Sequence, residues 1–327
     1  MSSFAAGKRP LLLVAVGGNA LIRAGQRGTA DEQFENALAT AGALVRLIKD
    51  GYRLVITHGN GPQVGAQLIR SETASRAAYR MPYDCCVAAT QGEIGYVLQY
   101  ALWQRMQQEH VRVPVVSLVT QVLIDKNDPA FLHPTKPVGP YYPREEADRL
   151  REDLGWALVE DAGRGWRRVV PSPEPREIIE LDAIRACIDQ GLVVIAAGGG
   201  GIPVSNDHET AKGMEAVIDK DLTSAVLARQ IGADLFVIAT AVERVFLDFG
   251  TPAQRPLESL TADEARRHLQ AGQFPEGSMA PKIHAALRFL DVGGREVLIT
   301  DTAHVLEAVR GETGTRIAAF PEFTDWP

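Results

Sequence analysis

The sequence predicts an α/β fold, with a mainly parallel central sheet and helices on both of its faces. Short, continuous apolar runs recur along the chain, as expected for strands that are buried on both sides. The clearest runs are LLLVAV, RLVIT, LVVIAA, LFVIAT and EVLIT. Segments with helical spacing of apolar residues separate them, and this alternation favours a parallel sheet. Several of the predicted strands end in glycine-bearing turns, where open α/β sheets bind their ligands.

Composition argues against several classes of protein. The chain has 327 residues, 46% hydrophobic and 23% charged, which is ordinary for a globular protein. The net charge of −7 argues against a general nucleic-acid binder, which would be basic. No apolar run approaches the length of a membrane span, and the N-terminal run is interpreted as a first strand rather than a signal peptide. The cysteines form no CxxC pair, which suits a reducing cytoplasm.

The first two predicted strands both end in a turn that combines glycine with asparagine. Leu11–Val16 runs into GGN at 17–19, and the strand at 53–57 runs into HGNG at 58–61. A helix with apolar residues at helical spacing is expected between them, at 31–49. Such glycines let backbone N–H groups approach a ligand, although a lone turn of this kind is more often a plain tight turn. The GxGxxxG spacing and an internal proline disfavour a dinucleotide-binding fingerprint.

A long helix and an inserted segment come next. Residues 81–109 contain EIGYVLQYALWQRM, whose broad apolar face indicates either core packing or a subunit interface. A third strand is expected at 113–119. Residues 125–172 then break the alternation, with a charged helix at 145–158 and a hairpin within 163–175, and they predict an inserted subdomain. Its basic residues indicate either a flap that closes on an anion or solvated charge: Lys126, Lys136, Arg167 and Arg168.

Four consecutive glycines, at 198–201, follow a predicted helix at 178–189 and a predicted strand at 192–197. A glycine run is costly in chain entropy, so we expect close backbone approach there.

The stretch AVIDKDLTSAVLA, at 216–228, is the one around which the site is expected to form. Asp219, Lys220 and Asp221 open its helix, with Asp221 expected near the cap. A lysine flanked by carboxylates at a helix N-terminus can face a phosphate. The plain alternative is a capped surface helix.

The last part of the chain repeats the same design. A strand is expected at Leu235–Thr240, and a helix at 259–269 is led by a capping pattern. The sequence GSMAPK, at 277–282, begins another helix in a manner suited to anions. A final strand at 296–300 precedes a last helix.

Together these features favour phosphoryl transfer. If the glycine-bearing strand ends share one sheet edge, backbone N–H groups and the three lysines Lys126, Lys220 and Lys282 would surround a phosphate. No general base is obvious, and an acceptor that is already an anion, such as a carboxylate or carbamate, would need none. The sequence contains no GxxxxGK[ST] loop, HExxH helix, GxSxG turn or spaced Cys/His set, so no metal site of protein ligands is expected.

Along nearly its whole length the chain resembles the carbamate kinases of the amino-acid kinase family. The matching motifs are VAVGGNAL, THGNGPQVG, QGEIGY, DKNDPAFLHPTKPVGP, WRRVVPSPEP, AAGGGGIPV, EAVIDKDLTSA and GSMAPK. The resemblance implies a three-layer αβα sandwich, a single domain over 1–327 with a small protruding subdomain at about 125–172, and a homodimer. It implies interconversion of ATP and carbamate with ADP and carbamoyl phosphate, with Mg²⁺ carried by the nucleotide. The reaction would often run toward ATP, in arginine or in purine and allantoin breakdown.

The resemblance and the residue patterns together assign candidate roles. The expected catalytic residues are Lys126 (delivered by the subdomain), Lys220, Lys282 and the acid that orients the lysines, Asp221. The expected phosphate and substrate residues are Gly17, Gly18, Asn19, Gly59, Asn60, Gly61, Gly198, Gly199, Gly200 and Asp219. The expected nucleotide residues are Thr240, Val242, Val245, Phe246, Gly277, Ser278 and Met279. Many relatives carry Asp at Ala241 and Gly at Ala280, on the nucleotide side of the site.

Two other functions stay open at this point. The chain would fit a related kinase for another small carboxylate, such as an N-acyl amino acid, if an arginine pair clamped a larger substrate. It would also fit a non-catalytic sensor of carbamoyl phosphate or nucleotide on the same fold. The presence of Lys220, Asp221 and Lys282 argues against the sensor.

Overall fold

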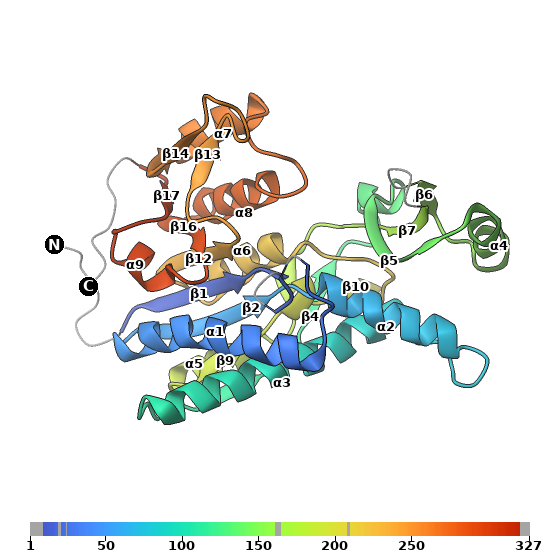
Figure 1. Ribbon diagram of the computed structural model, residues 1–327, viewed down its shortest axis with the longest axis horizontal. Helices are drawn as coiled ribbons and strands as arrows, with labels where there is room; N and C mark the ends of the chain where they lie inside the picture. The colour runs from blue at the N-terminus through green and yellow to red at the C-terminus, as the bar shows by residue number, and fades with distance from the viewer. Residues whose placement is uncertain (1–8, 19–20, 24, 161–164, 208–209, 321–327) are drawn as a thin grey trace.

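An eight-stranded sheet forms the centre of the molecule (Figure 1). The computed structural model describes residues 9–18, 21–23, 25–160, 165–207 and 210–320. The strands of this sheet lie in the order β15 (Ser259–Thr261), β17 (Thr315–Ala318), β16 (Glu296–Asp301), β12 (Leu235–Thr240), β1 (Leu11–Val16), β2 (Arg53–His58), β9 (Val193–Ile195) and β3 (Val115–Ser117). All neighbours are parallel except β16 and β17, which are antiparallel.

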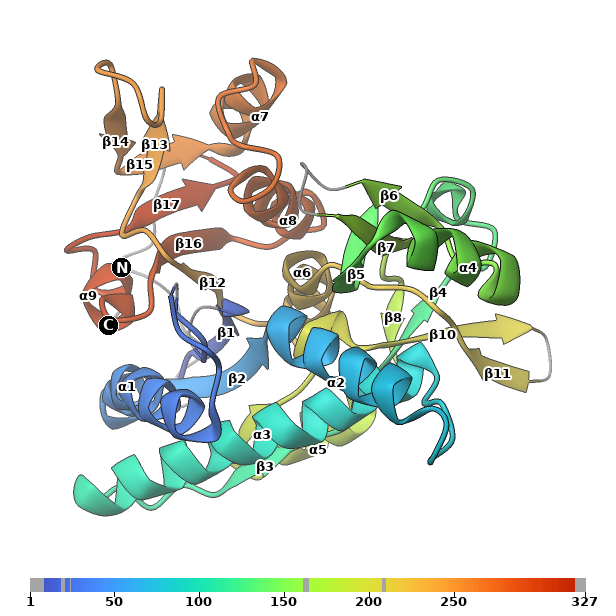
Figure 2. The ribbon, with the colours of Figure 1, turned by 45° about the vertical axis from the view of Figure 1, so that its right-hand side comes forward.

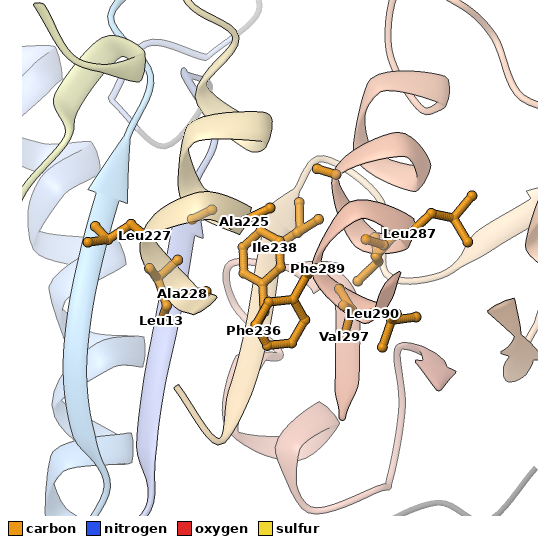
Figure 3. Close-up of a cluster of buried hydrophobic side chains, with 14 of the residues drawn as sticks. Leu13, Ala225, Leu227, Ala228, Phe236, Ile238, Leu287, Phe289, Leu290 and Val297 are labelled. Carbon is orange, nitrogen blue, oxygen red and sulfur yellow. The ribbon is translucent and has the colours of Figure 1, made fainter. Parts of the chain in front are cut away.

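Helices cover both faces of this sheet, which confirms the predicted three-layer αβα arrangement. One face carries α1 (Ala30–Lys49), α3 (Tyr83–Gln108) and α9 (Val305–Val309). The other face carries α5 (Leu181–Asp189), α6 (Lys220–Gln230), α7 (Ala262–Gln270) and α8 (Ala280–Asp291). Alternate residues of β1 pack into the two cores, so each strand must be apolar on both sides. Figure 3 shows the second core, where Phe236 of β12 meets Phe289 of α8 edge to face, with ring centroids 5.6 Å apart.

The inserted segment builds a sheet of its own. Its strands lie in the order β5 (Lys136–Tyr142), β7 (Trp166–Val170) and β6 (Leu158–Glu160), and α4 (Arg144–Leu154) packs on them through a small core of Tyr142, Ala147 and Leu158. In Figures 1 and 2 this unit, coloured green, projects to one side of the central sheet. We call it the protruding subdomain and define it as the described residues of 136–170.

Two smaller sheets complete the described chain. One has the order β11 (Thr210–Gly213), β10 (Ile202–Asp207), β4 (Gln121–Ile124) and β8 (Glu177–Ile178). The other pairs β13 (Val245–Leu247) with β14 (Arg255–Leu257). Other helical elements of the described chain are α2 (Gly61–Ala74), the 3-10 turn η2 (Pro129–Phe131) and the 3-10 turn η3 (Gly198–Gly200).

Several element boundaries differ from the expectation, each for a local reason. The helix expected at 145–158 ends at Leu154, because Gly155 adopts the left-handed conformation with φ +66°. The helix expected at 259–269 begins at Ala262, where Thr261 and Glu264 form the predicted capping box, and the residues before it pair as β15. The β10–β11 hairpin was not predicted, since its sequence shows little alternation.

Candidate active site

The two glycine turns that follow β1 and β2 lie against each other. The Gly17 N–H donates to the Ala239 carbonyl at 3.1 Å, and the Gly59 N–H donates to the Val16 carbonyl at 3.1 Å. A Cβ on Gly59 would lie 3.2 Å from the Gly18 nitrogen, which is a tight contact, so the two turns are closely packed. The strand ends therefore meet at one edge of the sheet, as expected. Asn19, a predicted site residue, lies outside the described residues.

The glycine run after β9 is buried behind these turns. There is no room for a side chain at any of these glycines. A Cβ added to Gly198 would lie 2.3 Å from His58 Nε2, one added to Gly199 would lie 2.2 Å from Asn60 Nδ2, and one added to Gly200 would lie 2.2 Å from the Ile218 carbonyl oxygen. The expected close backbone approach is real, but its partners here are residues of the same chain. Ligand contact by Gly198, Gly199 and Gly200 stays a prediction.

His58, which the sequence analysis did not single out, sits under the site as a neutral ring. It is 2% exposed and ends β2, with Nδ1 3.1 Å from the Gly59 carbonyl oxygen. Burial lowers the pKa of His58 to about 4; the Gly59 carbonyl opposes the shift and the charge of Lys220 adds to it. The imidazole therefore adds no charge at neutral pH. Asn60 is also buried, and its Nδ2 donates to Thr90 Oγ1 at 2.9 Å.

A buried carboxylate holds two lysines together at the N-termini of α6 and α8. Asp221 Oδ1 lies 2.7 Å from Lys220 Nζ, and Asp221 Oδ2 lies 3.3 Å from Lys282 Nζ. The three side chains are 6%, 13% and 17% exposed, in the order Asp221, Lys220, Lys282. Burial alone would raise the pKa of the Asp221 carboxyl, but the two ammonium groups outweigh burial and hold it below its usual value.

Backbone carbonyls fix the positions of both ammonium groups. Lys220 Nζ donates to the Val16 carbonyl at 3.4 Å, which places it at the end of β1 beside the first glycine turn. Lys282 Nζ donates to the Ser278 carbonyl at 3.2 Å. The arrangement brings together predicted residues that lie 61 positions apart in the chain.

The cap of α6 corrects one expectation. Asp219, not Asp221, is the N-cap: its Oδ1 accepts from the N–H groups of Asp221 at 2.9 Å and Leu222 at 3.3 Å. Asp221 is therefore free to turn inward from the first turn of the helix. The two acids of the DKD sequence therefore have different roles: Asp219 accepts hydrogen bonds from the backbone, and Asp221 pairs with the two lysines.

The lysine that the protruding subdomain brings to this cluster is Lys136. Lys136 is the first residue of β5, and its Nζ lies 3.4 Å from Asp219 Oδ2. Its side chain is 42% exposed. Lys126, the lysine expected in this place, is exposed in the turn after β4. The residue pattern placed both lysines in one basic segment, and the family resemblance assigned the role to Lys126, whereas the structure places Lys136 beside Asp219. Arg168 of the same segment is buried against Glu215, at 2.5 Å.

Two adjoining cavities open beside the cluster. The larger, of about 570 Å³, is lined by Gly17, Gly18, Lys282 and residues of α1, β12 and the end of β16. The smaller, of about 120 Å³, is mainly apolar and shares Thr240 and Ala241 with the larger one. Among the predicted nucleotide residues, those that line it are Thr240, Val242, Phe246, Ser278 and Met279.

The other two predicted nucleotide residues do not line this cavity, and the sequence missed two that do. Val245 is buried, and its N–H faces Thr315 Oγ1 at 2.9 Å, while Gly277 is exposed. Phe249 and Pro275 line the cavity, with the Phe249 ring centroid 6.0 Å from that of Phe246. Phe249 lies in the turn after β13, where the sequence carries no periodic pattern, so the sequence analysis did not identify it.

The geometry suits an anion that carries several negative charges. Two ammonium groups share one carboxylate, so the cluster keeps net positive charge, and the N-terminus of α6 adds its dipole. The Gly18 N–H after β1 and the Gly61 N–H after β2 can approach the same space, whereas those of Gly17 and Gly59 are already donated to backbone carbonyls. An apolar cavity of the kind that takes a planar ring adjoins it. A site that accepts phosphate at one end and a planar base at the other fits a nucleotide.

Comparisons with known proteins agree with this description. The Amino acid kinase family model matches residues 10–301. The chain is 46% identical to a carbamate kinase of Thermococcus kodakarensis over 94% of its own length and 98% of that protein. It is 48% identical to the carbamate kinase-like protein YahI of Escherichia coli, over 94% and 99%. A structure of carbamate kinase from Giardia lamblia bound to AMP-PNP superposes with a TM-score of 0.91, at 39% identity, covering 95% of this chain and 98% of that one. This chain belongs to the amino acid kinase family.

Proposed function

We propose that this protein is a carbamate kinase, which transfers a phosphoryl group between carbamoyl phosphate and ADP. The observation that carries the proposal is the pair of ammonium groups held on Asp221, between the glycine turns and a two-part cavity. Relatives named carbamate kinase match nearly the full chain and support the same reaction. The chain would act as one domain, with the protruding subdomain closing over the substrate.

In the direction of ATP synthesis, the bond between phosphorus and the carbamoyl oxygen breaks as a bond to the ADP β-phosphate oxygen forms. Charge spreads over the oxygens of the transferred group, and positioning and electrostatics supply most of the catalysis. Lys220 and Lys282 neutralise that charge, and Asp221 fixes their positions. The N–H groups of Gly17 and Gly59 hold the two turns in place, those of Gly18, Asn60 and Gly61 face the transferred group, and Asp219 caps α6.

No proton has to be removed by the enzyme in either direction. Carbamate is an anion, so it attacks ATP without a general base, and it leaves from carbamoyl phosphate as the same anion. The only histidine described beneath the site, His58, is held neutral and buried, which agrees with a mechanism that needs no base there.

We further propose that Mg²⁺ arrives bound to the nucleotide phosphates and is part of the substrate. The described residues contain no group of three or more His, Cys, Asp and Glu side chains placed to hold a metal ion. Asp219 and Asp221 each face a lysine, and Asp301, which lines the larger cavity, faces His304. Adenine would occupy the apolar cavity between Phe246 and Met279. Net flux toward ATP, in arginine or purine and allantoin breakdown, is part of the proposal.

None of the described helices is both long and apolar enough to cross a bilayer. We propose a cytoplasmic location, which the three free cysteines support. Fractionation of cells that produce the protein tests this, and recovery with membranes would contradict it.

We also propose a homodimer formed through α3 and the edge strand β3. A groove of about 500 Å³ lies there, lined by Tyr96, Tyr100 and Trp103. Tyr96 and Trp103 are 61% and 56% exposed, which is unusual for aromatic side chains grouped on one helix. β3 is also the last strand of the sheet, and its outer edge pairs with no other strand among the described residues.

The proposed dimer predicts a mass in solution of twice 35.4 kDa by sedimentation equilibrium. Replacement of Trp103 by Glu should yield a folded monomer, because a charge would be buried in the apolar contact. Glu160→Lys, which changes an exposed acid of β6 in the protruding subdomain, serves as the control and should stay dimeric. A wild-type monomer would contradict the proposal.

The activity itself is tested by ATP production from ADP, Mg²⁺ and freshly made carbamoyl phosphate, with acetyl phosphate and N-acetylglutamyl phosphate as parallel donors. Turnover confined to carbamoyl phosphate is expected. Turnover only with another donor would establish the related kinase instead. Folded protein that binds ADP and uses no donor would establish the sensor.

Replacement of Lys136 by Ala should lower kcat/KM for carbamoyl phosphate by roughly 10- to 100-fold, because a charge near the transferred group is lost. ADP affinity should change little. Lys126→Ala, in the same inserted segment but exposed, is the matched control and should stay within about twofold of wild type. The role first expected for Lys126 predicts the reverse ranking, so steady-state kinetics of the two variants decide between them.

A further inference from the structure

Residues 215–219, which we call the docking segment, lie between β11 and α6, and at every second position they contact the protruding subdomain or the residue that follows it. The contacts are Glu215 with Arg168, the Val217 N–H with the Pro171 carbonyl just after β7 at 2.9 Å, and Asp219 with Lys136. The last of these contacts lies at the N-cap of α6, directly before Lys220.

The residues between these contacts anchor the docking segment in the body of the protein. Ala216 and Ile218 are 0% and 1% exposed and belong to the core that contains α6 and α8. The Val217 side chain instead packs against a separate apolar cluster, in which Val138 and Val170 of the subdomain meet residues of α2, α3 and β10. One side of the segment therefore belongs to the main core and the other side receives the subdomain.

Arg168 is the most buried charged contact of this interface. Its side chain is 8% exposed, whereas that of Glu215 is 58% exposed. Nη2 donates to Glu215 Oε2 at 2.5 Å, and the guanidinium lies 4.1 Å from the ring centroid of Trp156, in the turn after α4. A guanidinium removed from water needs its partner, so the position of Glu215 restricts where the subdomain can lie.

Because β5 and β7 are paired, a restriction on the position of Arg168 also restricts the position of Lys136. Arg168 is opposite Val138 in the β5–β7 ladder, and Lys136 is opposite Val170. The two cations thus lie on neighbouring strands about two residues apart, or roughly 7 Å along the strand direction. Fixing Arg168 on Glu215 fixes the start of β5 over Asp219.

We propose that Arg168 and Glu215 are positioning residues, whose ion pair docks the protruding subdomain on the docking segment and thereby places Lys136 at the phosphoryl site. The inference rests on the proposed function for its kinetic consequence. Neither residue touches the substrate. Their pair sets how often Lys136 is in place when the donor is bound.

A double-mutant cycle tests the proposal, with kcat/KM for the phosphoryl donor measured in wild type, Glu215→Ala, Lys136→Ala and the double variant. Glu215→Ala should lower kcat/KM about tenfold in the wild-type background, and less than about twofold where Lys136 is already absent. A merely structural role would lower it by the same factor in both backgrounds. Equal factors, or no loss in Glu215→Ala, would overturn the proposal.

Hydrogen–deuterium exchange of the β5 amides gives a second readout that needs no turnover. Exchange should accelerate in Glu215→Ala and stay at the wild-type rate in Glu160→Ala, which removes an exposed acid from β6 of the same subdomain. Unchanged β5 exchange in Glu215→Ala would overturn the docking role. If wild type used none of the donors, the proposed function would fail, and this exchange experiment would still decide whether the ion pair docks the subdomain.

Discussion

A buried carboxylate shared by two ammonium groups is the interaction on which the site depends. An isolated charge at the position of Asp221 would cost several kcal/mol through lost hydration. Lys220 and Lys282 compensate for that cost, and the lowered pKa of Asp221 is the sign that they do. Because the lysines come from two helices, the N-termini of α6 and α8 must stay side by side for the carboxylate to remain satisfied. The same contact that stabilises the fold therefore holds two positive charges where a phosphoryl group can use them.

The rest of the site follows from the position of α6. Its N-cap, Asp219, releases Asp221 to turn inward and offers its other oxygen to Lys136. The docking segment before it packs into the main core through Ala216 and Ile218, and it contacts the protruding subdomain through Glu215. Behind it, glycine is required in η3 because the Ile218 carbonyl and the side chains of His58 and Asn60 fill the space that side chains would need. Packing, capping and charge thus act on one short stretch of chain.

Sequence alone revealed the layered fold because apolar strands and amphipathic helices carry local, periodic signals. It also located Lys220, Asp221 and Lys282, since charges at glycine- or proline-marked helix starts are visible without a structure. It assigned the cap to Asp221, because neighbouring acids compete for one cap and only backbone geometry decides. The choice between Lys126 and Lys136, and the partner of Arg168, depend on how an inserted sheet sits on the body, which is a long-range property. The contribution of Phe249 to the apolar cavity could not be predicted either, because it depends on the path of a turn in three dimensions.

The most direct test of this account is the turnover number of Asp221→Asn, a substitution that keeps the shape of the side chain and removes its charge. We expect kcat for ATP synthesis to fall by about 100-fold or more, because two unrestrained ammonium groups lose their positions relative to the phosphoryl group. Circular dichroism and ADP binding should confirm that the variant is folded. A folded variant with kcat within about threefold of wild type would contradict the central role of the shared carboxylate.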